Sequence, residues 1–147
     1  MSDLRDLYQE VILDHNKRPR NFRVLEPCSH KAQGYNPLCG DKVMVYLDVQ
    51  DGIIKDVSFQ GSGCAISSAS ASLMTETLKG RSVTEVEQLF DNFHDAVTGA
   101  AKPSLSLGKL AVLAGVRDYP SRVKCATLVW HAVRAALENR TESVATE

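Results

Sequence analysis

The sequence predicts an α+β fold, in which a small antiparallel three-stranded sheet packs against several helices. Residues 42–49 alternate between apolar and polar side chains, and Asp51-Gly52 is a strong signal for a two-residue hairpin turn. Residues 53–59 form the expected return strand, and one further short strand is expected within 21–37, which is otherwise a loop. Helical spacing of apolar residues dominates the second half of the chain. We therefore expect one domain over residues 1–147, with a frayed tail from about residue 139.

Most of the expected helices have a recognisable start or stop signal. The first helix shows apolar residues at i, i+3, i+4 and i+7 and ends before Pro19. Ser82 and Glu85 have the spacing of a capping box. Gly80 and Gly115 are placed to end the helices that precede them. The expected helices span about 4–17, 65–79, 83–97, 107–113 and 123–137.

Composition and charge exclude several classes of function. The chain has 147 residues with 17 Lys and Arg against 18 Asp and Glu, so its net charge is near −1. Non-specific nucleic-acid binding depends on excess positive charge, and we expect no nucleic-acid partner. We expect no membrane partner, because no apolar stretch has the length of a membrane span and no signal-peptide core is present. A cytoplasmic location is expected, where cysteines are more often thiols or metal ligands than disulfides.

Three of the four cysteines lie at expected junctions between a loop and a helix or strand. Cys39 precedes the first hairpin strand, and Cys64 and Cys125 are expected near helix N-termini, where the partial positive charge favours the thiolate. Asp41 lies two residues after Cys39, so on a regular strand both side chains point to the same side. These four residues could hold zinc or an iron–sulfur cluster. The alternative is that each cysteine is an ordinary buried thiol, because their spacing matches no common zinc finger.

Three motifs in the same order resemble the SufU/IscU family of iron–sulfur cluster assembly proteins, whose domain is similar to the NifU N-terminal domain. They are Cys39-Gly40-Asp41, residues 61–67 (GSGCAIS) and residues 122–126 (RVKCA). The likeness covers nearly the whole chain. Two features resemble the SufU branch: 60 residues separate Cys64 from Cys125, and Lys124 stands where IscU proteins usually have a histidine.

The resemblance implies a function in sulfur transfer. SufU-type proteins bind Zn²⁺ and accept persulfide sulfur from a PLP-dependent cysteine desulfurase (SufS-like), for later delivery to iron–sulfur assembly or to apo-proteins. The chain would thus be a partner of an enzyme rather than a stand-alone enzyme. The implied metal ligands are Cys39, Asp41, Cys64 and Cys125, with Cys39 as the sulfur acceptor and with Arg122 and Lys124 as accessory residues. Arg122 would hold Asp41 or steer the anionic persulfide.

Two other functions remain open from the sequence. IscU-type relatives assemble a [2Fe–2S] cluster or bind iron on the equivalent ligands, and there the last cysteine, here Cys125, is the usual sulfur acceptor. A third function is a domain whose metal only holds the fold and whose surface binds a protein partner. Native metal content separates the first two, and an effect on desulfurase turnover separates both from the third.

The remaining polar residues have simpler interpretations. Cys28, with His30 nearby, is interpreted as an incidental thiol, and His15 as a cap at the end of the first helix. His94 and His131 are expected in core or surface roles. A basic patch (Lys17, Arg18, Arg20, Arg23) is interpreted as a solvated helix end, with docking on the desulfurase as the alternative. The small residues 67–72 indicate close packing of their helix on the sheet.

Overall fold

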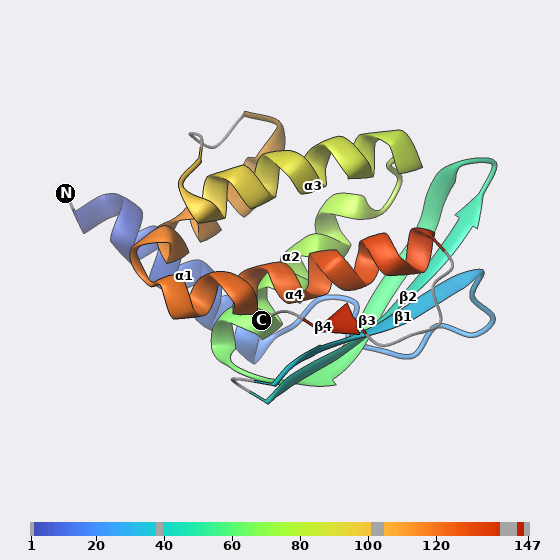
Figure 1. Cartoon of the computed structure of the whole chain (residues 1–147), viewed down its shortest axis with the longest axis horizontal. Helices are drawn as coiled ribbons and strands as arrows, with labels where there is room; N and C mark the ends of the chain where they lie inside the picture. The colour runs from blue at the N-terminus through green and yellow to red at the C-terminus, as the bar shows by residue number, and fades with distance from the viewer. Residues whose placement is uncertain (1, 38–39, 101–104, 139–143, 146–147) are drawn as a thin grey trace.

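The computed structural model describes residues 2–37, 40–100, 105–138 and 144–145 (Figure 1). After the first helix, the strands of the sheet come early in the chain and most helices come later, which confirms the predicted α+β class. In chain order the elements are α1 (Ser2–Lys17), β1 (His30–Asn36), β2 (Asp41–Gln50), β3 (Ile53–Ser62), α2 (Ala65–Leu78), α3 (Val83–Thr98), the 3₁₀ segment η1 (Leu105–Asp118), α4 (Pro120–Leu137) and β4 (Val144–Ala145).

The sheet contains the three predicted antiparallel strands in the order β3-β2-β1, and β4 adds to it at the free edge of β1. In the register of β1 and β2, Asn36 lies opposite Asp41. In the register of β2 and β3, Lys42 lies opposite Ser62. The two-residue strand β4 pairs in parallel with β1. The other residues of the expected C-terminal tail, 139–143 and 146–147, lie outside the described residues.

Helices cover one face of this sheet. Alternate residues of β2 are buried, with Val45 and Leu47 fully so, while their neighbours on the other face are more accessible. Helix α4 packs against β1 and β2, and α2 packs against β3 and α4 (Figure 1). The buried face of β2 begins with Asp41, so a carboxylate lies at the end of an otherwise apolar row. In the described part of the chain, no helix has the length and apolar character needed to span a membrane.

Two expected elements differ from the observed ones. The last helix begins at Pro120 rather than near Val123, because proline at the first helical position has a suitable φ and needs no hydrogen-bonding partner for its nitrogen. Cys125 therefore lies in the second turn of α4 and not in the first. The short helix expected over 107–113 is the longer 3₁₀ segment η1, which is interrupted at Gly108, where φ is 55°.

The core between α3 and α4 contains a stacked pair of aromatic rings. Phe93 and Trp130 are both 1% exposed, and their ring centroids are 5.0 Å apart. Phe93→Ala should lower the free energy of unfolding by about 3–5 kcal/mol, because it removes buried surface and leaves a cavity. Chemical denaturation measures this loss. Leu13→Ala, at a helix position that is 61% exposed, is the control and should change stability by about 0.5 kcal/mol or less. A similar loss in both variants would contradict the assignment of the core.

Candidate metal centre

Asp41 is held at the start of β2 by the loop that follows β3. The side chain is fully buried, and its Oδ1 accepts a hydrogen bond of 2.8 Å from the backbone N–H of Cys64. Gly63 makes this approach possible. A Cβ atom there would lie 2.5 Å from Asp41 Oδ1 and 2.9 Å from its Cγ. Only a residue without a side chain leaves room for the carboxylate.

Cys64 is the N-cap of α2. Its backbone is extended, with φ −71° and ψ 167°, and its sulfur accepts the N–H of Ser67 at 3.4 Å. The predicted position of this cysteine at the junction of loop and helix is thereby confirmed. The same sulfur lies 3.8 Å from Asp41 Oδ2. Cys64 thus contacts the carboxylate through both its amide and its thiol.

Cys125 completes the group from α4 and is fully buried. Its sulfur is 4.0 Å from the side-chain nitrogen of Asn36 and 3.9 Å from Nη1 of Arg122, and both nitrogens donate towards it. The expected accessory residue Arg122 thus contacts a candidate ligand. Lys124 is half-buried on the same helix.

One ligand atom from each of Asp41, Cys64 and Cys125 lies within 4.8 Å of the others, and this is the only such group of three or more potential ligands among the residues that the structure describes. The structure thus brings together three of the four residues expected from the sequence. The fourth, Cys39, lies outside the described residues. Two sulfurs and one carboxylate oxygen fit a thiophilic ion such as Zn²⁺ and also an iron–sulfur cluster.

Two residues near the centre were not assigned to it from the sequence. Asn36 is fully buried at the end of β1, and no local pattern shows that its amide points at a sulfur 89 residues away. Tyr8 lies on α1, where the sequence indicates only a position in the apolar pattern of the first helix. Burial raises the pKa of the Tyr8 phenol, with further contributions from Tyr119 and Cys64. The Tyr8 phenol therefore lies close enough to the candidate centre for the charge of Cys64 to affect its pKa.

Cys28 lies outside the candidate centre. This thiol is half-buried and lines a pocket of about 620 Å³ together with His30. It is not part of the group formed by Asp41, Cys64 and Cys125.

Comparisons with known proteins agree with this geometry. Residues 7–126 match the NifU-like N terminal domain family. The chain belongs to this family. Over 133 residues it is 40% identical to the zinc-dependent sulfurtransferase SufU of Bacillus subtilis (strain 168), with 90% of each chain covered. Over 139 residues it is 39% identical to the iron-sulfur cluster assembly scaffold protein IscU of Streptococcus pyogenes serotype M1, with 94% of this chain and 87% of the relative covered.

A solved structure of a related protein has the same fold. It is described as a putative iron-sulfur cluster assembly scaffold protein for the SUF system from Fervidobacterium islandicum AW-1. Its TM-score is 0.84 at 34% sequence identity, with 89% of this chain and 96% of that chain covered. The family assignment therefore rests on sequence and structure together. It places the chain in iron–sulfur cluster assembly.

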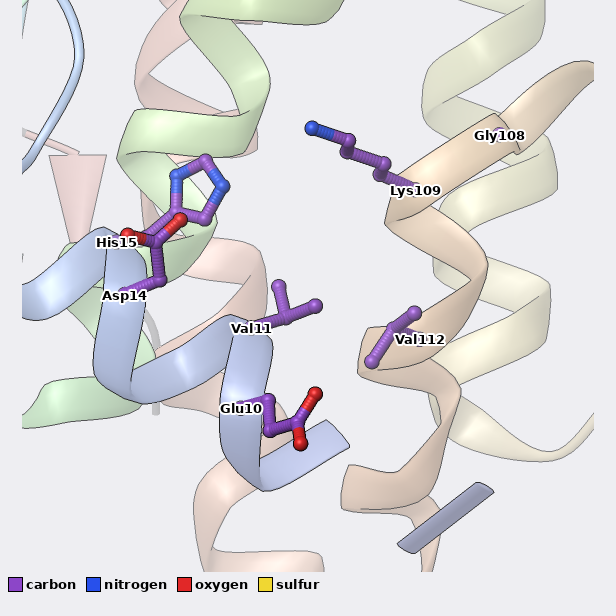
Figure 2. A pocket seen from close by; sticks show the side chains of 7 residues that line it. All are labelled: Glu10, Val11, Asp14, His15, Gly108, Lys109 and Val112. Carbon is purple, nitrogen blue, oxygen red and sulfur yellow. The ribbon is translucent and has the colours of Figure 1, made fainter. Parts of the chain in front are cut away.

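A separate pocket of about 520 Å³ lies between α1 and η1, and none of the residues of the centre line it. Figure 2 shows Lys109 extending from η1 towards His15 and Asp14 on α1. His15 lies in the last turn of α1, as expected, but it is only 1% exposed, and its imidazole connects α1 to Ser72 and Glu76 of α2 instead of capping the helix end. His15 Nε2 lies 3.7 Å from Glu76 Oε1, so we place the imidazole proton on Nε2, and Nδ1 then accepts the hydroxyl hydrogen of Ser72, 2.7 Å away.

The buried His15 makes stability dependent on pH. Burial, together with Arg20, holds the pKa of His15 below its ordinary value of 6.5. Asp14, Glu76 and Lys109 also act on it. The unfolded chain therefore binds this proton more readily, and the free energy of unfolding should fall as the pH drops below 6.5. Between about pH 7 and pH 5, the free energy of unfolding measured by denaturation should fall less for His15→Gln than for the wild type. His30→Gln is the control, and an unchanged slope in His15→Gln would contradict this account.

The basic patch is partly neutralised within the molecule. Arg20 pairs with Asp14 at 2.7 Å, and Arg23 pairs with Asp56 at 2.9 Å. The small residues 67–72 pack closely, as expected, but Ser70 donates to the Ala126 carbonyl of α4, so a helix as well as the sheet is the packing partner.

Proposed function

We propose that the chain is a zinc-dependent sulfur acceptor, which takes persulfide sulfur from a PLP-dependent cysteine desulfurase for iron–sulfur cluster assembly. The supporting observation is the convergence of Asp41, Cys64 and Cys125, a carboxylate and two thiols from three separate elements. Cys39, two residues before Asp41 in the sequence, is proposed as the fourth ligand. Together they would hold Zn²⁺, which keeps the thiols deprotonated and ordered.

Cys39 is the proposed sulfur acceptor. Its thiolate attacks the outer sulfur of the desulfurase persulfide, so a new S–S bond forms on Cys39 and the desulfurase cysteine leaves as a thiolate. No other oxidant or reductant is needed. Arg122, whose guanidinium already faces the sulfur of Cys125, would attract the anionic persulfide. Among the described residues, Cys28, Cys64 and Cys125 are thiols that form no disulfide, which fits the reducing cytoplasm that we propose as the location.

The second candidate function is a scaffold that assembles a [2Fe–2S] cluster. The same donor set supports it, because thiolates hold such clusters, and the Streptococcus pyogenes relative is described as a scaffold protein. Lys124, in place of the histidine usual in IscU proteins, favours the sulfur acceptor. Metal analysis after anaerobic purification separates the two: one zinc and no colour, or iron with acid-labile sulfide.

A desulfurase assay tests the proposed function. The wild-type chain should raise turnover of a cognate cysteine desulfurase, and Cys39→Ser should abolish that increase because the acceptor sulfur is gone. Mass spectrometry after reaction with cysteine should locate the added sulfur on Cys39. Cys28→Ser is the control and should behave as wild type. Sulfur found on Cys125, with Cys39→Ser still active, would instead support the scaffold function, and no effect of the wild-type chain would support a purely structural metal.

A further inference from the structure

Two histidines face each other across the contact between α3 and α4, apart from the cysteine centre. His94 on α3 and His131 on α4 have ring centroids 6.4 Å apart, with the ring planes inclined at 78°. Both side chains are half-buried, so each ring is accessible from solvent. The two helices run side by side in Figure 1. Nothing in the proposed sulfur chemistry uses this pair.

The neighbouring contacts show that this juxtaposition is part of a regular pairing of the helices. One turn before His94 is Asp91, and one turn after His131 is Arg134, whose Nη2 lies 3.5 Å from Asp91 Oδ1. Moving forward by three residues on α3 thus corresponds to moving back by three on α4, as in antiparallel helices. The guanidinium of Arg134 also lies 3.8 Å above the ring of Phe90. The Arg134 guanidinium beside the two histidines is therefore held by Asp91 and Phe90.

The distance between the imidazoles is close to that required by a shared metal ion. With metal–nitrogen bonds of about 2.0–2.1 Å, two imidazoles on a tetrahedral ion have centroids roughly 5 Å apart. Rotation of the two half-buried side chains supplies the remaining difference of roughly 1 Å. Imidazole suits borderline divalent ions such as zinc, copper and nickel.

We propose that His94 and His131 form a second site for a divalent transition-metal ion, bound by one imidazole nitrogen from each helix. Water fills the remaining positions, so binding is weaker than at a centre made of thiolates. The site shares no residue with Asp41, Cys64 and Cys125. It is therefore independent of the proposed sulfur-acceptor function.

Calorimetric titration of the metal-free, reduced full chain with zinc at pH 7.5 tests the proposal. We expect a tight phase from the cysteine centre and a weaker second phase from the histidine pair. His94→Ala should weaken only the second phase, by at least about tenfold, since even the loss of outer partners costs that much at metal sites. His131→Ala should do the same. His30→Ala, which removes a histidine elsewhere, is the matched control and should leave both phases unchanged.

Cys64→Ser separates this proposal from the proposed function. This variant should lose the tight phase and keep the weaker one. The affinity of the histidine site can therefore be measured even if the cysteine centre does not bind zinc. Both imidazoles pack against Phe90, so circular dichroism of each variant checks that the fold is kept, and His94→Ala provides the deciding variant. The proposal would be overturned if the wild type showed no weak phase, or if the weak phase persisted unchanged in His94→Ala.

Discussion

Gly63→Ala is expected to weaken metal binding by about a hundredfold while leaving the chain folded. The new Cβ would lie 2.5 Å from Asp41 Oδ1, so the buried carboxylate must move away. That movement removes a candidate ligand and also breaks the hydrogen bond from the Cys64 amide. The fold should survive, because Gly63 has no left-handed φ and alanine fits its backbone. Competition with a chromophoric zinc chelator measures the affinity.

Ser62→Ala is the matched control for this variant. Ser62 is the exposed neighbour of Gly63 at the end of β3, and its substitution adds no atom near Asp41. Its zinc affinity should equal that of the wild type. An unchanged affinity in Gly63→Ala, with circular dichroism showing an intact fold, would remove Asp41 from the proposed ligand set.

Asp41→Ala is expected to separate cluster retention from sulfur turnover. The carboxylate is the only hard oxygen among the described candidate ligands, and we expect it to be the most easily exchanged of the donors. Without it, an iron–sulfur species reconstituted on the thiolates should be retained longer, whereas stimulation of the desulfurase should be largely lost. Visible absorbance and acid-labile sulfide report the first effect, and cysteine turnover reports the second.

Asp48→Ala, on the same strand but with its carboxylate near Gln50, controls for the loss of a negative charge on β2. It should leave both readouts as in the wild type. Asp41→Asn keeps the size of the side chain and should resemble Asp41→Ala, because its charge is gone. If Asp41→Ala matched the wild type in both measurements, the carboxylate would have no part in the chemistry.

The parts of the fold that were predictable from the sequence are those fixed by local signals. The turn at Asp51-Gly52 lies between β2 and β3 as expected, and both residues have positive φ. Helix α3 begins with the capping box of Ser82 and Glu85, in which both reciprocal hydrogen bonds are present. In each case the residues that specify the structure lie within three positions of one another.

The parts that were not predictable depend on contacts between distant segments. The burial of His15 requires α1 to pack against α2, where Ser72 is 57 residues away. The sequence motifs indicate Asp41, Cys64 and Cys125. The contact of the Asn36 amide with the Cys125 sulfur depends instead on the register of β1 against β2, which places Asn36 opposite Asp41. Local periodicity contains no information about either contact.

The thiol cap of α2 couples the centre to the backbone of a helix. Helix starts usually rely on an oxygen of Ser, Thr, Asp or Asn, whereas the first turn of α2 relies on the sulfur of Cys64. An ion held by that sulfur replaces the thiol proton, and a metal-bound thiolate accepts the Ser67 N–H more strongly than a neutral thiol does. Hydrogen–deuterium exchange at this one amide should therefore become slower on loading. By the reciprocity of linkage, anything that frays the start of α2 also lowers the affinity of the centre for its ion, so a protein that pulls this turn open can promote release without touching a ligand.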